Sequence, residues 1–278
     1  MDWLELFKAA IIGVIQGITE WLPVSSTGHI ILADELIRLG VSEEFKEMFD
    51  VVIQFGSILA VVVLFFHKLN PFSPQKSSEE KKSTLRLWGK VLIAALPAAL
   101  IGLPFNDLID ELFFNYQTVA LTLIVYGVLF ILVERRNRVR TPKIADVDGI
   151  DYRTALWIGV FQILALIPGT SRSGSTILGG ILVGASRFAA AEFSFFLAIP
   201  VMLGASGLKI LKFGMETGFA MTATESAVLI TGMVVAFLVS LAAIRFLMGF
   251  VKRHNFKVFG YYRIVLGLLV LGYFWVMR

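Results

Sequence analysis

The chain has 278 residues, of which 57% are hydrophobic and 17% are charged, and its mean hydropathy is +0.79. Soluble domains carry about 25% charged residues, so this composition excludes a soluble globular protein, and the 24 Phe residues exclude a disordered one. The apolar stretches are continuous rather than alternating, which argues against a transmembrane β-barrel. Because the chain has no Cys, it can form neither disulfides nor thiolate metal sites.

The net charge of +4 does not indicate a nucleic-acid partner. The basic residues gather in a few loops between apolar stretches, which is the pattern of membrane proteins. The first five residues, Met1–Glu5, include two acidic residues and no basic one. No short apolar region that ends in a signal-peptidase cleavage site follows them. We therefore expect an integral membrane protein without a secretory signal.

Eight apolar stretches follow one another along the chain, and we expect helices because lipid offers the backbone no other hydrogen-bond partner. Six stretches predict plain membrane spans. The other two are interrupted by Pro, Gly and polar residues, and they predict helix–break–helix hairpins that dip into the membrane. In chain order the elements are a hairpin at 8–38, spans at 51–66, 91–105 and 118–134, a second hairpin at 155–185, and spans at 188–208, 226–248 and 259–277.

The two hairpins resemble each other in sequence. Ile12–Gln16 (Ile-Gly-Val-Ile-Gln) matches Ile158–Gln162 (Ile-Gly-Val-Phe-Gln), and a proline and a Ser-rich break follow in both. Each hairpin is followed by three spans. We therefore predict an all-α fold of two repeats, the first at 1–134 and the second at 155–278, joined by a cytoplasmic linker at 135–154.

Charge predicts the orientation. Loops 67–90 and 135–153 are rich in Lys and Arg and are separated by two spans, so both should lie on the cytoplasmic side, together with Lys252, Arg253 and Lys257. The loop between those spans holds Asp107, Asp110 and Glu111 and no basic residue. An odd number of spans per repeat inverts the second repeat, so one hairpin enters from each side. Inverted repeats with broken helices place a polar site near the midplane.

The second break, Pro168–Thr176 (Pro-Gly-Thr-Ser-Arg-Ser-Gly-Ser-Thr), predicts a phosphate-binding site. An arginine at membrane depth is costly unless it is paired or hydrated. Here glycines let backbone N–H groups converge, the following helix adds a positive end, and the Arg172 fork matches two phosphate oxygens. The alternative is a surface loop with a solvated Arg172. The expected diphosphate-binding residues are Gly169, Ser171, Arg172, Ser173, Gly174 and Thr176.

The first break contains a carboxylate, hydroxyls and a histidine. Gln16 and Glu20 are four residues apart and share a helix face. Glu20 is a candidate ligand for a divalent cation or a candidate base. Ser26 is a candidate nucleophile, and His29, one helical turn later, could activate it or protonate a leaving group. The alternatives are that Glu20 is a structural partner of Arg172 and that His29 only packs.

Other polar residues are weaker signals. Ser25 and Thr27 are more simply explained as caps of the restarting helix. Gln54, Ser57, Glu192 and Ser194 either line the site or form polar contacts between helices. The stretch Phe193–Phe196 is expected to contact lipid.

The two breaks carry motifs of a known family. Gln16-x-x-x-Glu20 followed by Pro23–His29 (Pro-Val-Ser-Ser-Thr-Gly-His) resembles the first signature of the bacterial undecaprenyl-diphosphate phosphatase (bacitracin-resistance protein) family. Pro168–Thr176 resembles its second signature, P-G-x-S-R-S-x-x-T. The first acidic position of the family is often Glu, whereas Gln16 carries an amide that cannot act as a base. The resemblance covers the whole chain, including Val52–Ala60 and Glu192–Phe195.

The resemblance implies a multi-pass enzyme of the bacterial inner membrane with an inverted-repeat fold. It implies removal of the terminal phosphate of undecaprenyl diphosphate, a requirement for a divalent cation (Mg²⁺ or Ca²⁺), and bacitracin resistance on overproduction. The product, undecaprenyl phosphate, is recycled as the carrier for peptidoglycan and other wall polymers.

Combined with the residues above, the resemblance predicts a mechanism. Arg172, with Ser171, Ser173 and Thr176, holds the diphosphate, and Glu20, with Gln16 beside it, binds the cation. Ser26 attacks the terminal phosphorus with help from His29; alternatively, His29 positions water or protonates the bridging oxygen. The family's substrate leads us to expect access from the outer face.

Two other functions fit the sequence: a secondary transporter or flippase for an anion or lipid phosphate, and a lipid-binding protein without catalysis. The sequence leaves open the nucleophile, the face to which the site opens, the cation, the prenyl chain length and the oligomeric state, a homodimer included.

Overall fold

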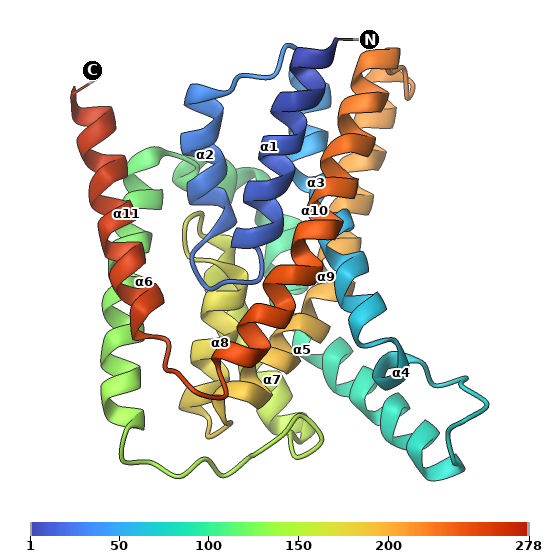
Figure 1. The fold of residues 1–278 in the computed structure, drawn as a ribbon, viewed down its shortest axis with the longest axis vertical. Coiled ribbons are helices and arrows are strands. Elements are labelled where there is room, and N and C mark those ends of the chain that lie inside the picture. Colours follow the sequence, from blue (N-terminus) through green and yellow to red (C-terminus); the bar gives the residue numbers. More distant parts are fainter. Residues whose placement is uncertain (1, 277–278) are drawn as a thin grey trace.

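The computed structural model describes residues 2–276, without the side chains of Glu35, Asn106 and Asp110. This part of the chain is helical, and its only extended pairing is an isolated bridge between Ile144 and Ala185. Figure 1 shows most of the long helices running roughly along one axis, with connections gathered at the two ends. In chain order they are α1 (Trp3–Thr19), α2 (Ser26–Leu36), α3 (Glu43–Leu64), α4 (Phe66–Leu69), α5 (Ser78–Phe113), α6 (Tyr116–Asn137), α7 (Tyr152–Ile163), the short 3₁₀ turn η1 (Leu164–Leu166), α8 (Arg172–Leu182), α9 (Arg187–Thr217), α10 (Ala223–Phe250) and α11 (Lys257–Val276).

The predicted spans are confirmed as helices. Six helices in the described part of the chain are long and apolar enough to cross a membrane: α3, α5 over Ser78–Phe105, α6, α9, α10 and α11. The last residue of the predicted span at 259–277 lies outside the described residues.

The helices α3 and α5 are longer than the predicted spans at 51–66 and 91–105. Ser42 caps α3 and accepts the backbone N–H of Phe45, so the acidic run that begins at Glu43 forms the first turns of the helix. The helix α5 starts at Ser78 and continues to Phe113, so most of the predicted loops at 67–90 and around 107–111 is helical. Acidic residues in a first turn favour the helix N-terminus, and polar side chains do not end a helix.

Both predicted hairpins are confirmed as helix–break–helix segments, α1–α2 and α7–η1–α8. The two breaks end on serines with the same rare backbone conformation, because φ is 72° at Ser25 and 73° at Ser171. Each serine caps the following helix: Ser25 Oγ accepts the N–H of Gly28, and Ser171 Oγ accepts that of Gly174. A positive φ is strained for any residue with a Cβ, so the structure repeats one strained turn in both breaks.

Each hairpin packs against a helix of the other predicted repeat. The helix α1 lies against α10, and α7 lies against α5. Glycines allow both contacts: a Cβ at Gly13 would lie 2.8 Å from Gly232 O, and one at Gly159 would lie 2.2 Å from Ala94 O. In Figure 1 the two breaks approach each other from opposite ends and meet near the middle of the molecule. The repeat boundaries and the inverted relation of the repeats stay predictions.

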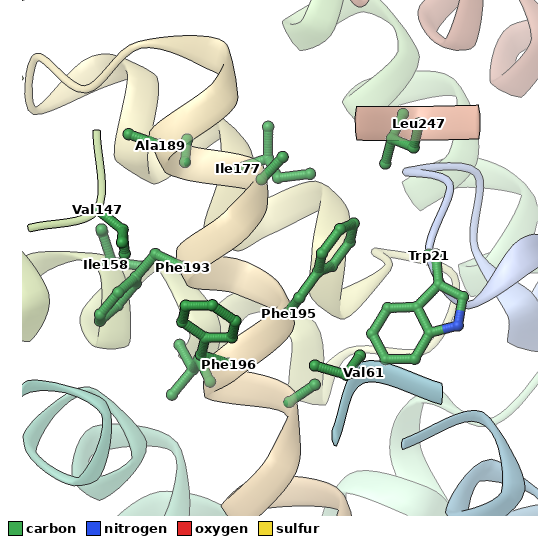
Figure 2. Packing of buried hydrophobic residues seen from close by; sticks show 14 of the residues in the cluster. Trp21, Val61, Val147, Ile158, Ile177, Ala189, Phe193, Phe195, Phe196 and Leu247 are labelled. Atoms are coloured by element: carbon green, nitrogen blue, oxygen red, sulfur yellow. The ribbon is translucent and has the colours of Figure 1, made fainter. Parts of the chain in front are cut away.

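The Phe-rich stretch of α9 was expected to contact lipid, and this prediction is wrong. Phe193, Phe195 and Phe196 are fully buried in the main hydrophobic cluster. Figure 2 shows them packed around α9 among side chains from several other helices, and Trp21 from the first break meets Phe195 edge to face. The helix α9 is central, with contacts to α3, α5 and α8, so its aromatic residues fill the core.

The basic connections gather at one end of the molecule. Figure 1 places the segments between α4 and α5, between α6 and α7, and between α10 and α11 at the lower end, opposite both termini. This arrangement agrees with the prediction that they share one side of the membrane.

Candidate active site

Arg172 is the first residue of α8, and it lies at the contact between the two breaks. Its Nη2 is 3.0 Å from Glu20 Oε1, and its Nη1 donates to the carbonyl oxygen of Ser194 at 2.7 Å. The guanidinium also lies 5.7 Å from the centre of the Trp21 ring. Only 11% of the side chain is exposed, so the alternative of a solvated surface arginine is wrong.

Glu20 connects this arginine to the first break. Its Oε2 accepts hydrogen bonds from Gln16 Nε2 at 3.0 Å and from Ser26 Oγ at 3.0 Å. Gln16 is fully buried at the end of α1 and Glu20 is nearly so, whereas Ser26 begins α2 and is partly exposed. The pairing of Glu20 with Arg172, which the sequence offered as the alternative role of this carboxylate, therefore exists, and the same carboxylate also contacts the candidate nucleophile.

Ser173 strengthens the contact between the breaks. Its hydroxyl donates to the backbone carbonyl of Glu20 at 3.1 Å. Thr176, one turn further along α8, donates to the carbonyl of Arg172 at 2.9 Å, and its hydroxyl lies 2.7 Å from Ser194 Oγ. These hydroxyls thus hold the start of α8 in place.

Arg263 in α11 contacts both breaks, and the sequence analysis missed it. It is fully buried. Its guanidinium donates to Pro23 O at 3.2 Å and to Gly169 O and Thr170 O at 2.9 Å each. An arginine within a predicted apolar span was a readable signal, because such residues are rare unless they have a role.

His29 lies on α2 and does not contact Ser26 by a hydrogen bond. Its Nδ1 is 2.7 Å from the carbonyl oxygen of Ser25, and its Nε2 is 2.6 Å from the hydroxyl of Tyr262. Because a carbonyl only accepts, a neutral His29 carries its proton on Nδ1 and accepts the Tyr262 proton at Nε2. Tyr262 is a second residue that the sequence analysis missed, and nothing in its surroundings in the sequence marked it.

The remaining predicted residues shape the break. Gly169 has a φ of 85°, and a Cβ there would lie 2.2 Å from Thr122 Oγ1, so both the turn and the close approach require glycine. A Cβ at Gly174 would lie 3.3 Å from Arg263 Nη1. Ser171 serves as the cap of α8, as Ser25 does for α2, which confirms the predicted capping role of Ser25.

Among the weaker signals, Ser194 belongs to the site through its contacts with Arg172 and Thr176. Glu192 does not, since both its carboxylate oxygens lie 3.0 Å from Lys68 Nζ. Ser57 is fully buried in α3, and its hydroxyl has no hydrogen-bond partner among the described residues.

The groups that could hold a hard divalent cation here are the Glu20 carboxylate and the side-chain oxygen of Gln16, whose Nε2 donates to Glu20. Gln16 Oε1 is buried and has no hydrogen-bond partner within the described part of the chain. Among the side chains that the structure describes, no group of three His, Asp or Glu residues could hold a metal ion. A cation here would therefore take its remaining ligands from phosphate and water, which is common for Mg²⁺.

The site combines groups that suit phosphate chemistry. Arg172 sits at a helix N-terminus, where backbone N–H groups and the helix dipole favour an anion. Its Nε–H has no acceptor among the described residues, so the fork retains a donor. A hydroxyl bonded to a carboxylate, as in Ser26 and Glu20, is the arrangement of a nucleophile beside its base.

These features define a class of protein: a polytopic α-helical membrane protein that brings an arginine, a carboxylate and a hydroxyl together where two broken helices meet. The sequence pattern of the family described as "Bacitracin resistance protein BacA" matches residues 9–269. The chain belongs to this family, and the resemblance found in the two motifs is confirmed.

Named relatives are similar over their full length. The undecaprenyl-diphosphatase of Acetivibrio thermocellus is 62% identical, over 99% of this chain and 100% of its own. The enzyme of Enterococcus faecalis is 59% identical over 98% and 99%, respectively. That of Lachnoclostridium phytofermentans is 56% identical over the full length of both chains.

Proposed function

We propose that this protein is an undecaprenyl-diphosphate phosphatase. It hydrolyses the terminal phosphate of undecaprenyl diphosphate to give undecaprenyl phosphate and inorganic phosphate, which recycles the lipid carrier for cell-wall synthesis and confers bacitracin resistance. The observation that carries the proposal is the contact of Glu20 with both Arg172 and Ser26, at 3.0 Å each. It joins an anion-binding group, a base and a nucleophile in one cluster.

Arg172 and the start of α8 hold the diphosphate. The planar guanidinium matches two phosphate oxygens, and the helix N-terminus adds the backbone N–H of Ser173, because that of Gly174 is donated to the capping Ser171 Oγ. Both elements also stabilise the charge that spreads over the equatorial oxygens during phosphoryl transfer.

Ser26 is the nucleophile in our proposal, and Glu20 is its base. The Ser26 proton passes to Glu20 Oε2 as Oγ bonds to the terminal phosphorus. The bond from that phosphorus to the bridging oxygen breaks, and its electron pair leaves with undecaprenyl phosphate. Water then hydrolyses the phosphoserine and releases inorganic phosphate, which restores the Ser26 hydroxyl.

His29 has a supporting role in this scheme. Its ring is stacked parallel to Tyr262, with centroids 5.6 Å apart, and both of its nitrogens have partners. This arrangement supports a role in holding the start of α2, on which Ser26 lies. A direct role of His29 toward water or the bridging oxygen is the alternative, and it requires that Tyr262 release Nε2.

A divalent cation, Mg²⁺ or Ca²⁺, is part of the proposal. Gln16 and Glu20 would hold it, and it would neutralise phosphate oxygens of the substrate. The support is the buried Gln16 Oε1, which has no hydrogen-bond partner among the described residues and belongs to an amide whose Nε2 donates to the Glu20 carboxylate. Titration of EDTA-treated protein with Mg²⁺ should restore phosphate release in the wild type.

We place the protein in the bacterial inner membrane, with its basic connections in the cytoplasm and the polyprenyl tail of the substrate in apolar grooves beside the hairpins. A homodimer is a hypothesis that the mass of the purified protein in detergent tests.

Phosphate release from undecaprenyl diphosphate by purified protein in detergent, with and without EDTA, tests the function. We expect release that EDTA abolishes. A transporter or a lipid-binding protein would release no phosphate, and a transporter would instead move its substrate across sealed liposomes.

A further inference from the structure

A polar concavity lies at the end of the molecule that carries the basic connections. Its volume is about 730 Å³, which falls within the range of roughly 300–1,000 Å³ found for small-molecule sites. Three separate segments line it: the end of α6 with the following linker, the start of α9, and the connection from α10 to α11. We call it the basic pocket, defined by Glu134, Arg138, Arg140, Arg187, Lys252 and Lys257.

The charges in the basic pocket are not balanced. Glu134 is buried and pairs with Arg187, whose Nε and Nη2 lie within 3.1 Å of its carboxylate. Arg138, Arg140, Lys252 and Lys257 have no carboxylate within ion-pair distance in the described part of the chain. Five basic residues against one acidic residue leave four positive charges around one cavity.

The walls of the basic pocket are fixed by hydrogen bonds. Ser186, which caps α9, donates from its backbone N–H to Ile144 O at 2.8 Å and from its hydroxyl to Ala145 O at 2.6 Å. Glu134 accepts the backbone N–H of Phe256 at 3.1 Å, which ties α6 to the start of α11. The linker and the α10–α11 connection are therefore held against α6 and α9.

Membrane topology alone does not account for this arrangement. The orientation rule requires Lys and Arg in cytoplasmic connections, but it does not require basic residues from three segments to converge around one cavity. Converging, unpaired cations are the usual means of binding phosphate groups.

We propose that the basic pocket is a second binding site, which takes a phosphorylated anion and is distinct from the site at Arg172. Two sources supply this chemistry at a membrane surface: the phosphate headgroup of an anionic lipid and soluble inorganic phosphate. Both would be held by Arg138, Arg140, Lys252 and Lys257, so the ligand chemistry is the same and an experiment separates the sources.

The absence of cysteine makes a local test simple. Val139 lies between two pocket arginines and is 92% exposed, so Val139→Cys can carry an environment-sensitive fluorophore as the single label in the chain. The labelled protein is titrated with inorganic phosphate in neutral detergent. A second set of titrations uses nanodiscs in which phosphatidylglycerol replaces phosphatidylcholine stepwise.

The variant Arg138→Gln/Lys252→Gln removes two pocket charges. The matched control, Lys81→Gln/Arg86→Gln, removes two charges from α5 at the same end of the molecule but outside the pocket. We expect a saturable signal that the pocket variant weakens at least tenfold and the control changes less than twofold.

A signal with inorganic phosphate identifies a soluble ligand, and a signal with phosphatidylglycerol alone identifies a lipid headgroup. No saturable signal with either probe, or equal weakening in both double variants, would overturn the proposal. The label lies next to two residues that line the pocket, and its fluorescence does not require turnover, so these outcomes are independent of phosphatase activity at the Arg172 site.

Discussion

At the scale of single residues, the account depends on how Glu20 divides its two oxygens between Arg172 and Ser26. An isolated buried carboxylate would be costly, and the arginine compensates for this cost. The serine then receives a negatively charged acceptor within hydrogen-bond distance. In the proposed mechanism, one carboxylate thereby links substrate binding to activation of the nucleophile.

The role of Ser26 predicts the outcome of a conservative substitution. We expect Ser26→Ala to lower kcat by at least about 10²-fold with little change in KM, because the hydroxyl acts in the chemical step. Phosphate release by the purified variant measures this. The control is Thr19→Val, because the Thr19 hydroxyl is bonded within its own helix, to Ile15 O. Wild-type activity of Ser26→Ala would exclude serine as the nucleophile and leave water or His29.

Arg263 predicts a second effect at this scale. Its guanidinium group donates to carbonyl oxygens of both breaks. The ammonium group of a lysine cannot reach three separated acceptors. We expect Arg263→Lys to remain folded but to lose about 10²-fold in kcat/KM, since small displacements of catalytic groups have effects of this size. Thermal unfolding and phosphate release are measured for this variant and for the control Arg253→Lys, whose side chain is exposed. A lower kcat/KM at an unchanged melting temperature distinguishes a displaced site from loss of structure. Unchanged kcat/KM would show that Arg263 does not position the site.

At the scale of elements, close helix contacts through glycine place the hairpins. The contact between α3 and α10 is the tightest example outside the hairpins, because a Cβ at Gly56 would lie 2.2 Å from Met233 O. Such an approach leaves no room for a methyl group, so an alanine at this position would force the two helices apart.

This contact gives a stability prediction. We expect Gly56→Ala to destabilise the protein by about 1–3 kcal/mol through overpacking. Gly204→Ala in α9 is the control, because a Cβ there meets nothing within 4 Å, and alanine favours a helix. Thermal unfolding in one detergent compares the two, and equal melting temperatures would refute the predicted packing.

How far the sequence predicted these elements depended on local signals. The breaks at Pro23 and Pro168, and the apolar spans, were recognisable because proline and polarity mark them locally. The burial of Phe193–Phe196 was not, since a helix inside a bundle and one facing lipid have the same apolar composition. The pairing of His29 with Tyr262 was equally hidden, because it joins residues far apart in the chain.

At the scale of the whole molecule, the basic connections share one end and the termini share the other. We expect the first end to face the cytoplasm. In the cysteine-free chain, Val139→Cys should react with a membrane-impermeant maleimide only after cell lysis. Met221→Cys, in the exposed connection between α9 and α10, should react in intact cells. The reverse pattern would invert the proposed topology.

The most direct test of the account is a double-mutant cycle across the two breaks, measured as kcat/KM for phosphate release from undecaprenyl diphosphate. The variants are Glu20→Asp, Arg172→Lys and their combination, all chosen to keep the charges of the buried pair. If the breaks act as one site, the double variant should lose little more activity than the worse single variant. If the two losses simply multiply, Glu20 and Arg172 act independently, and the joint site is contradicted.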